Sequence, residues 1–151
     1  MTQRIDYQTT LAAGMRALGG VYLYLGKSGL PSALLDLVYL RASQINGCAY
    51  CIDMHSRDAL KAGMPVAKLM LVSAWRETEE LFTEKERAAL CWTEAVTRID
   101  QTRAPDSDYR AAASQFDQQE LADLTLAIGL IGVYNRIAIS FRRSPDNAAP
   151  T

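Results

Sequence analysis

Two cysteines and the only histidine of this 151-residue chain lie within one eight-residue segment, from Cys48 to His55. Cys51 follows Cys48 by three residues, and His55 follows Cys51 by four. If the segment is helical, the three side chains share one face, because positions three and four apart are neighbours on a helix. A thiol pair with a base within reach is the minimum set of groups for redox chemistry at sulfur.

Peroxide reduction by this segment would require a thiolate, and an unperturbed cysteine with a pKa of about 8.5 is mostly protonated at neutral pH. The pair lies in the first turn of the predicted helix, where free N–H groups and the helix dipole favour an anion. His55 can accept the proton of Cys51 directly or through a water. Cys51 would then become a sulfenic acid, and Cys48 would condense with it to a disulfide that an external dithiol reduces.

A carboxylate is expected to orient and polarise His55. Asp36 on the preceding predicted helix is the candidate, because the turn at Asn46-Gly47 folds that helix back along the cysteine helix. Asp53 and Asp58 are nearer in sequence. However, Asp53 is two residues from His55 and faces away on a helix, while Asp58 is three residues from it.

A structural zinc site is the sharpest alternative for the same residues. Cys48, Cys51, His55 and Cys91 number four, and three cysteines with one histidine form a known zinc ligand set. Against this, Cys91 lies in the apolar run of residues 88–92, which favours a place in the core. A second alternative is that the two cysteines are only small buried side chains without a chemical role. The histidine on the same helix face favours redox chemistry instead.

Composition places the chain among ordinary globular proteins. Apolar residues make up 49% and charged residues 22%, with a net charge of -1. We therefore expect no nucleic-acid partner. We see no apolar stretch of the about 20 residues that span a bilayer and no secretory signal, so we expect no membrane partner and a cytoplasmic location. There thiols stay reduced, and a close pair is more often catalytic, redox-sensing or metal-binding than structural.

Apolar residues recur at helical period almost throughout, and strand patterns are nearly absent, which predicts an all-α fold of about seven helices. We expect one domain over residues 1–143 and a flexible tail over 144–151. The final helix is apolar on much of its circumference, so we expect a homo-oligomer. The helices are expected at about 7–25 with a weak point at Gly19-Gly20, then at about 31–46, 48–62, 66–75, 84–96, 109–115 and 118–141.

The segment from Leu37 to His55 contains the run Ser-Gln-Ile-Asn-Gly-Cys-Ala-Tyr-Cys at residues 43–51. This segment resembles the core motif of the alkyl hydroperoxidase D (AhpD)-like proteins, which belong to the carboxymuconolactone decarboxylase superfamily. Residues 82–90 and 134–138 also resemble the small single-domain members. The resemblance implies an all-α homo-trimer or homo-hexamer with thiol peroxidase activity. The substrate would be a hydroperoxide and the electron donor a dithiol or a protein. No cofactor is implied beyond a redox-active disulfide between Cys48 and Cys51.

The resemblance also implies a role for each residue of the motif. Cys51 is the cysteine that is oxidised, and Cys48 resolves it and can donate a proton to the leaving group. His55 and Asp36 form the proton relay, with Asp36 at the position of a family glutamate. Aspartate is one methylene shorter, so a direct bond to His55 is expected to be lost or bridged by water.

A weakened relay leaves a second hypothesis open, a redox-sensing interaction protein with little turnover. In the decarboxylase branch of the superfamily the Cys-x-x-Cys pair is typically missing. Its presence at Cys48 and Cys51 therefore argues against lactone decarboxylation.

Overall fold

The structure, a computed structural model, describes residues 2–78 and 80–145, so most of the predicted tail lies outside the described residues. Every regular element in the described residues is helical, which confirms the all-α prediction. The elements are α1 (Tyr7–Thr10), α2 (Ala12–Leu25), α3 (Ser32–Asn46), α4 (Ala49–Lys61), α5 (Val66–Leu71), the 3-10 helix η1 (Val72–Glu77), α6 (Glu84–Thr97), α7 (Ile99–Thr102), α8 (Asp106–Ala113) and α9 (Gln118–Ser140).

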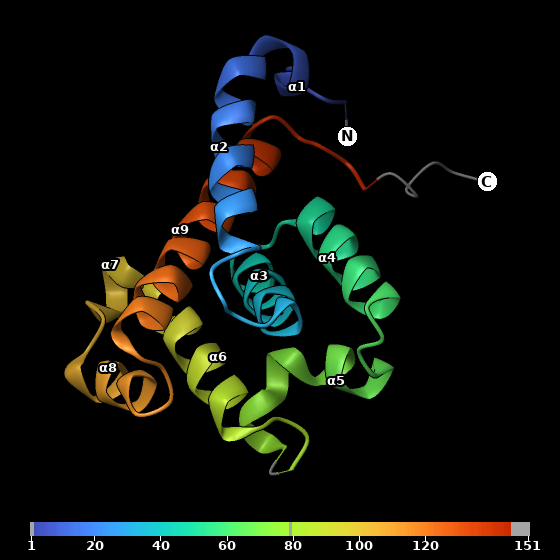
Figure 1. Cartoon of the computed structure of the whole chain (residues 1–151). Coiled ribbons are helices and arrows are strands. Elements are labelled where there is room, and N and C mark those ends of the chain that lie inside the picture. Colours follow the sequence, from blue (N-terminus) through green and yellow to red (C-terminus); the bar gives the residue numbers. More distant parts are fainter. Residues whose placement is uncertain (1, 79, 146–151) are drawn as a thin grey trace.

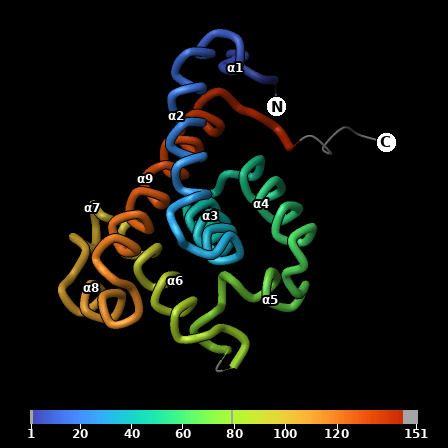
Figure 2. Tube along the Cα trace, viewed as in Figure 1, coloured from blue at the N-terminus to red at the C-terminus, as the bar shows by residue number. Residues whose placement is uncertain are grey.

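Helix α3 is the centre of the fold, viewed nearly end-on in Figure 1 with the other long helices arranged around it. It packs against α4, α6 and α9. The trace in Figure 2 follows α9 from α8 past α2 toward α1, where the backbone N–H of Arg4 donates to the carbonyl of Phe141 (3.0 Å). The larger apolar cluster joins α2, α3, α6, α8 and α9 and includes Cys48 and Cys51. A second cluster fills the space between α3, α5, η1 and α6.

Local sequence signals set the ends of the helices that carry the site. Gly47 ends α3 in the left-handed conformation, with φ 71°, which glycine adopts without a steric cost. Capping boxes at Thr83 and Asp117 begin α6 and α9, in agreement with the starts expected at residues 84 and 118. The turn at Gly47 reverses the chain, so that α4 packs along α3.

Four expectations about the helices differ from the structure. The first predicted helix breaks at Leu11 (φ -110°, ψ 28°), because the Asp6 side chain caps a separate short α1. α2 continues through Gly19-Gly20, since each glycine costs a helix only about 1 kcal/mol. The predicted helix at 66–75 is α5 followed by η1, with non-helical angles at Ala74, and the short α7 was not predicted.

Helix α9 corrects the expectation that no stretch is long and apolar enough to cross a membrane. By length and composition alone its 23 residues meet that requirement. Half of its most apolar stretch is buried inside the fold, as in the core helix of a globular domain. Its outward face still carries exposed Leu126 and Val133, so α9 contributes apolar surface both to the core and to the outside.

Candidate functional site

Cys48 and Cys51 form the centre of the candidate site at the first turn of α4. Cys48 is the N-cap residue, and its sulfur accepts the backbone N–H of Cys51 across 3.4 Å. A hydrogen bond joins the two sulfurs, which lie 2.7 Å apart. Both cysteines are free thiols and both are buried, with exposed fractions of 1% and 2%. The spacing in the sequence thus produces a reduced pair in contact at a helix N-terminus.

The two thiols ionise unequally because they share this contact. The hydrogen bond from Cys51 and the backbone N–H groups of Tyr50 and Cys51 lower the pKa of Cys48 to about 7, against the effect of burial. The same hydrogen bond to Cys48, together with burial, raises the pKa of Cys51. The pair therefore loses its first proton near neutral pH, and the proton that remains is shared across the sulfur contact. The first ionisation belongs to the pair through Cys48, and not to Cys51 acting with His55 as the sequence suggested.

A buried polar chain behind the sulfurs connects α3 to α9. Asn46 Nδ2 donates to Asn135 Oδ1 (2.9 Å), and Asn135 Nδ2 donates to Ser43 Oγ (3.0 Å). Hydrogen bonding from Asn135 lowers the pKa of both cysteine thiols. Sequence reasoning did not identify Asn135 or Ser43 as site residues. The available signal was an amide side chain in the middle of the most apolar helix.

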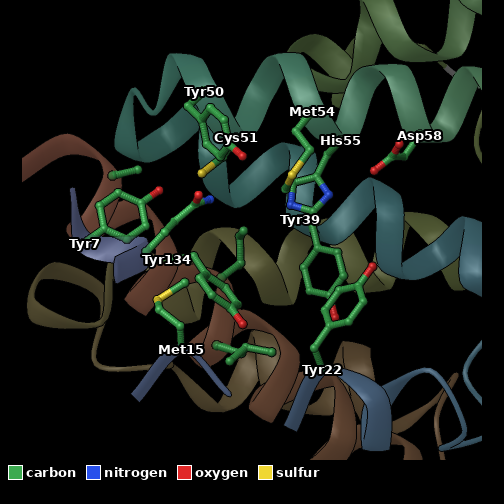
Figure 3. A pocket seen from close by; sticks show the side chains of 14 residues that line it. Tyr7, Met15, Tyr22, Tyr39, Tyr50, Cys51, Met54, His55, Asp58 and Tyr134 are labelled. Carbon is green, nitrogen blue, oxygen red and sulfur yellow. The ribbon is translucent and has the colours of Figure 1, made fainter. Parts of the chain in front are cut away.

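A cavity of about 340 Å³ opens beside the thiol pair. Figure 3 shows the α4 side chains along one side of it and tyrosines from α1, α2, α3 and α9 across from them. Cys51 lines the cavity, whereas Cys48 is not among its lining residues in the described chain. A bound molecule would therefore meet the Cys51 sulfur. The lining residues are Tyr7, Gln8, Met15, Tyr22, Tyr39, Tyr50, Cys51, Met54, His55, Asp58, Leu130, Ile131, Tyr134 and Ala138.

His55 lies in the same cavity wall, one turn beyond Cys51, as the spacing predicts. Its ring centroid is 5.0 Å from that of Tyr39. Burial lowers the pKa of His55 to about 4, and the charge of Asp58 acts in the opposite direction. The imidazole is therefore neutral at pH 7. Its Nε2 atom is buried and has no hydrogen-bond partner within the described residues.

The three aspartates considered from the sequence occupy different places. Asp58 lines the cavity, and its charge acts on His55. Asp36 is partly buried; burial and then the charge of Asp58 raise its pKa. Asp36 is not a lining residue, and in the part of the chain that the structure describes no hydrogen bond joins it to His55. Asp53 pairs with Arg57 (2.6 Å), in keeping with a position that faces away. The carboxylate at the cavity is thus Asp58, and not Asp36 as expected.

Cys91 lies apart from the pair. It is on α6, partly buried beside the second apolar cluster, and Arg76 Nη2 donates to its sulfur (3.7 Å). Within residues 2–78 and 80–145 no three of the histidine, cysteine and acidic side chains come close enough to hold a metal ion. The four residues of the predicted zinc set are therefore not assembled.

The fold and the site define a class: a helical protein with a buried Cys-x-x-Cys pair that opens on a tyrosine-lined cavity. Residues 9–95 match the model of the carboxymuconolactone decarboxylase family. The chain belongs to this family, among its AhpD-like members.

Several known proteins are similar to this chain. A solved protein of unknown function from Agrobacterium tumefaciens, which has been suggested to be the antioxidant defence protein AhpD, is 38% identical with a TM-score of 0.91; the match covers 95% of this chain and 98% of that one. The uncharacterised protein YdfG of Bacillus subtilis is 35% identical over 140 residues, which are 93% of this chain and 95% of YdfG. The debrominase Bmp8 shares the fold, with a TM-score of 0.76 at 21% identity, over 87% of this chain and 70% of its own.

Proposed function

We propose that this protein is a thiol-dependent hydroperoxide reductase in which Cys51 attacks the peroxide and Cys48 resolves the product. One observation carries the proposal: the two sulfurs are in contact at 2.7 Å, and only Cys51 of the two lines the cavity. A nucleophile needs access to its substrate, whereas a resolving thiol needs access only to the nucleophile. Membership of a family with AhpD-like proteins supports an antioxidant role.

The first step is attack by sulfur on the terminal oxygen of R–O–OH. The shared proton moves from Cys51 to Cys48 across the sulfur contact, which leaves the thiolate on the cavity side. An S–O bond forms on Cys51 while the O–O bond breaks, so sulfur loses two electrons and the peroxide gains them. Cys48 donates its proton to the departing alkoxide. The products are ROH, a sulfenic acid on Cys51 and a thiolate on Cys48.

The second step closes the disulfide. The Cys48 thiolate attacks the Cys51 sulfur, the S–S bond forms, and hydroxide leaves and takes a proton from solvent. The sum is ROOH plus two thiols giving ROH, water and one disulfide. An external dithiol, free or on a protein, then restores both thiols and becomes a disulfide itself.

We place His55 as a carrier of protons between the sulfurs and the cavity mouth. Because the pKa of His55 is about 4, the imidazole holds no proton at rest at neutral pH and acts by accepting and passing one in the same event. Asp36, which the family resemblance places in the relay, would reach His55 only through an intermediate carrier. Asp58 lines the cavity and its charge acts on His55, so it is the acid that we expect to polarise the imidazole.

The test is peroxide consumption by the reduced protein with a dithiol donor. We expect Cys51→Ser to reduce the rate to the background of the dithiol alone. Cys91→Ser is the matched control, since Cys91 lies outside the cavity, and it should retain the wild-type rate. Equal rates for wild type and Cys51→Ser would disprove the proposal. A protein that forms the disulfide without turnover, and changes its partner binding when oxidised, would instead be a redox sensor.

We also propose that the protein assembles as a homo-trimer or homo-hexamer through α9. Leu126 and Val133 are 43% and 39% exposed on the outward face of this helix, and an apolar face of this kind is typical of an interface between copies. Light scattering after size exclusion gives the mass directly. Leu126→Glu with Val133→Glu should yield monomers, and a monomeric wild type would disprove the assembly.

A further inference from the structure

The hydrogen-bonded side chains of Asn46, Asn135 and Ser43 are unusual because polar groups seldom cross an apolar core. Asn135 and Ser43 have no exposed surface, and they join helices α3 and α9 across the apolar core. One turn to either side of Asn135 on the same face of α9 lie Ile131 and Ala138, which belong to the apolar core. Burying an amide and a hydroxyl costs free energy even when they bond to each other, so an apolar pair would suit packing equally well. These hydrogen-bonded polar side chains therefore have a role other than packing.

The hydrogen bonds within the chain fix the direction of the Asn135 amide. Asn46 Nδ2 is a donor only, so the Asn135 atom that faces it at 2.9 Å is the carbonyl oxygen. The Asn135 NH₂ group therefore faces Ser43, whose backbone carbonyl accepts the N–H of Cys48 (3.0 Å), so the amide lies on the side of the thiol pair. A side-chain amide has two N–H donors, so it can serve an oxygen and a sulfur at once.

Asn135 acts on both sulfurs and not on one alone. Its hydrogen bonding lowers the pKa of the Cys48 thiol and of the Cys51 thiol, and Ser43 adds to the effect on Cys51. A donor common to both sulfurs favours the negative charge on either one. The proton can then exchange between Cys48 and Cys51 without the charge losing its partner.

We propose that Asn135, oriented by Asn46 and joined to Ser43, is a positioning residue that holds the single negative charge of the reduced thiol pair on whichever sulfur carries it. Its role in catalysis rests on the proposed peroxidase function, but its effect on the thiols does not. The amide loses this charged partner when the disulfide forms. Asn135 therefore stabilises the reduced pair relative to the disulfide and makes the pair more oxidising.

Two measurements on the full chain test the proposal without any peroxide. The first is the pH midpoint of thiolate absorbance in the reduced protein, and the second is the equilibrium of the disulfide with a dithiol buffer. In Asn135→Leu, which keeps the branching of the side chain and removes the donor, we expect the midpoint to rise by about one pH unit. At a pH above both midpoints, where the pair is a thiolate in wild type and variant, we also expect the disulfide to be favoured about tenfold, equivalent to about 30 mV toward more negative potential.

Further variants separate this effect from a general loss of stability. Asn135→Asp nearly keeps the shape and replaces the donor by an acceptor, so it should raise the midpoint at least as much. Ser43→Ala should produce a smaller shift in the same direction. Thr93→Val is the matched control, because it removes a buried hydroxyl bonded only to the Ala89 carbonyl of its own helix, and it should move neither quantity.

The other titratable and charged groups around the pair are unchanged in these variants: Tyr7 from α1, Tyr50 and His55 from α4, and Arg143, whose guanidinium lies over the Tyr50 ring. Should Asn135→Leu not fold, the same two quantities in Asn135→Asp and Ser43→Ala decide. Unchanged midpoint and potential in the folded variants would overturn the proposal. A shift in both quantities in a protein that shows no peroxide turnover would uphold it while disproving the proposed function.

Discussion

The backbone N–H of Cys51 donates to the sulfur of Cys48, so the first cysteine of the pair is also the N-cap of α4. One sulfur thereby serves the fold and the chemistry together. A helix N-terminus stabilises an anion, and the cap position is where an anion is best placed. Together with the larger effect of the hydrogen bond between the two sulfurs, this relationship lowers the pKa of Cys48, although it is Cys51 that faces the cavity.

Cys48→Ser should trap the first product of the proposed reaction. Serine is a good N-cap, so α4 is expected to keep its first turn, while the resolving thiol is gone. After one equivalent of peroxide, a sulfenic acid should accumulate on Cys51. Labelling with a sulfenic-acid reagent and peptide mass analysis would locate it. Label on Cys91, or none, would contradict the assignment of Cys51 as nucleophile.

The thiol pair should lose its first proton near pH 7. The hydrogen bond from Cys51 lowers the pKa of Cys48 to about 7, while the pKa of Cys51 is raised, so one thiolate forms in the neutral range. Thiolate absorbance of reduced Cys91→Ser protein would follow this step free of the third thiol. Cys48→Ser should abolish the transition. A midpoint at the ordinary thiol value of about 8.5 would contradict the prediction.

His55 should make the protein less stable as the solution is acidified from pH 6.5 toward pH 4. Burial lowers the pKa of His55 from 6.5 to about 4, so in this window the unfolded chain binds a proton that the folded chain does not. The free energy of unfolding therefore decreases as the pH decreases, and His55 contributes up to about 3 kcal/mol of this loss. Urea unfolding across the window measures the slope.

His55→Gln is the control for this slope, because the chain has no other histidine. Asp36 acts in the opposite direction, since its raised pKa lets the folded state take up a proton before the unfolded state does. Because His55→Gln removes the histidine and keeps Asp36, this variant should lose less stability on acidification than the wild type. The same slope in wild type and variant would contradict a buried neutral His55.

Gly47→Ala should destabilise the turn that aims the cysteine helix. Gly47 has φ 71° and no atom within 4 Å of an added Cβ, so the cost is one of backbone conformation alone, about 1–2 kcal/mol. Gly20→Ala is the matched control: the added Cβ also meets open space, but within α2, and it should stabilise by about 0.5–1 kcal/mol. Urea unfolding distinguishes the two signs, and a stabilised Gly47→Ala would contradict the argument.

The sequence by itself determined the elements and the local geometry of the motif. Apolar periodicity and the turn at Asn46-Gly47 predicted the helices that carry the site, and these helices are present. The contact between Cys48 and Cys51 follows from their spacing at a helix start. Such features depend on residues within about one turn of each other, so they can be inferred without the rest of the chain.

Only the tertiary structure decided what surrounds the motif. Asn135 reaches Asn46 and Ser43 from 89 and 92 residues away, and no local pattern indicates which face of α9 meets α3. The relative rotation of α3 and α4 likewise made Asp58, and not Asp36, the acid in the cavity wall. The order of ionisation depends on burial and on donors from other helices. Packing between distant helices sets all three, because burial and long-range hydrogen bonds exist only once the helices have assembled.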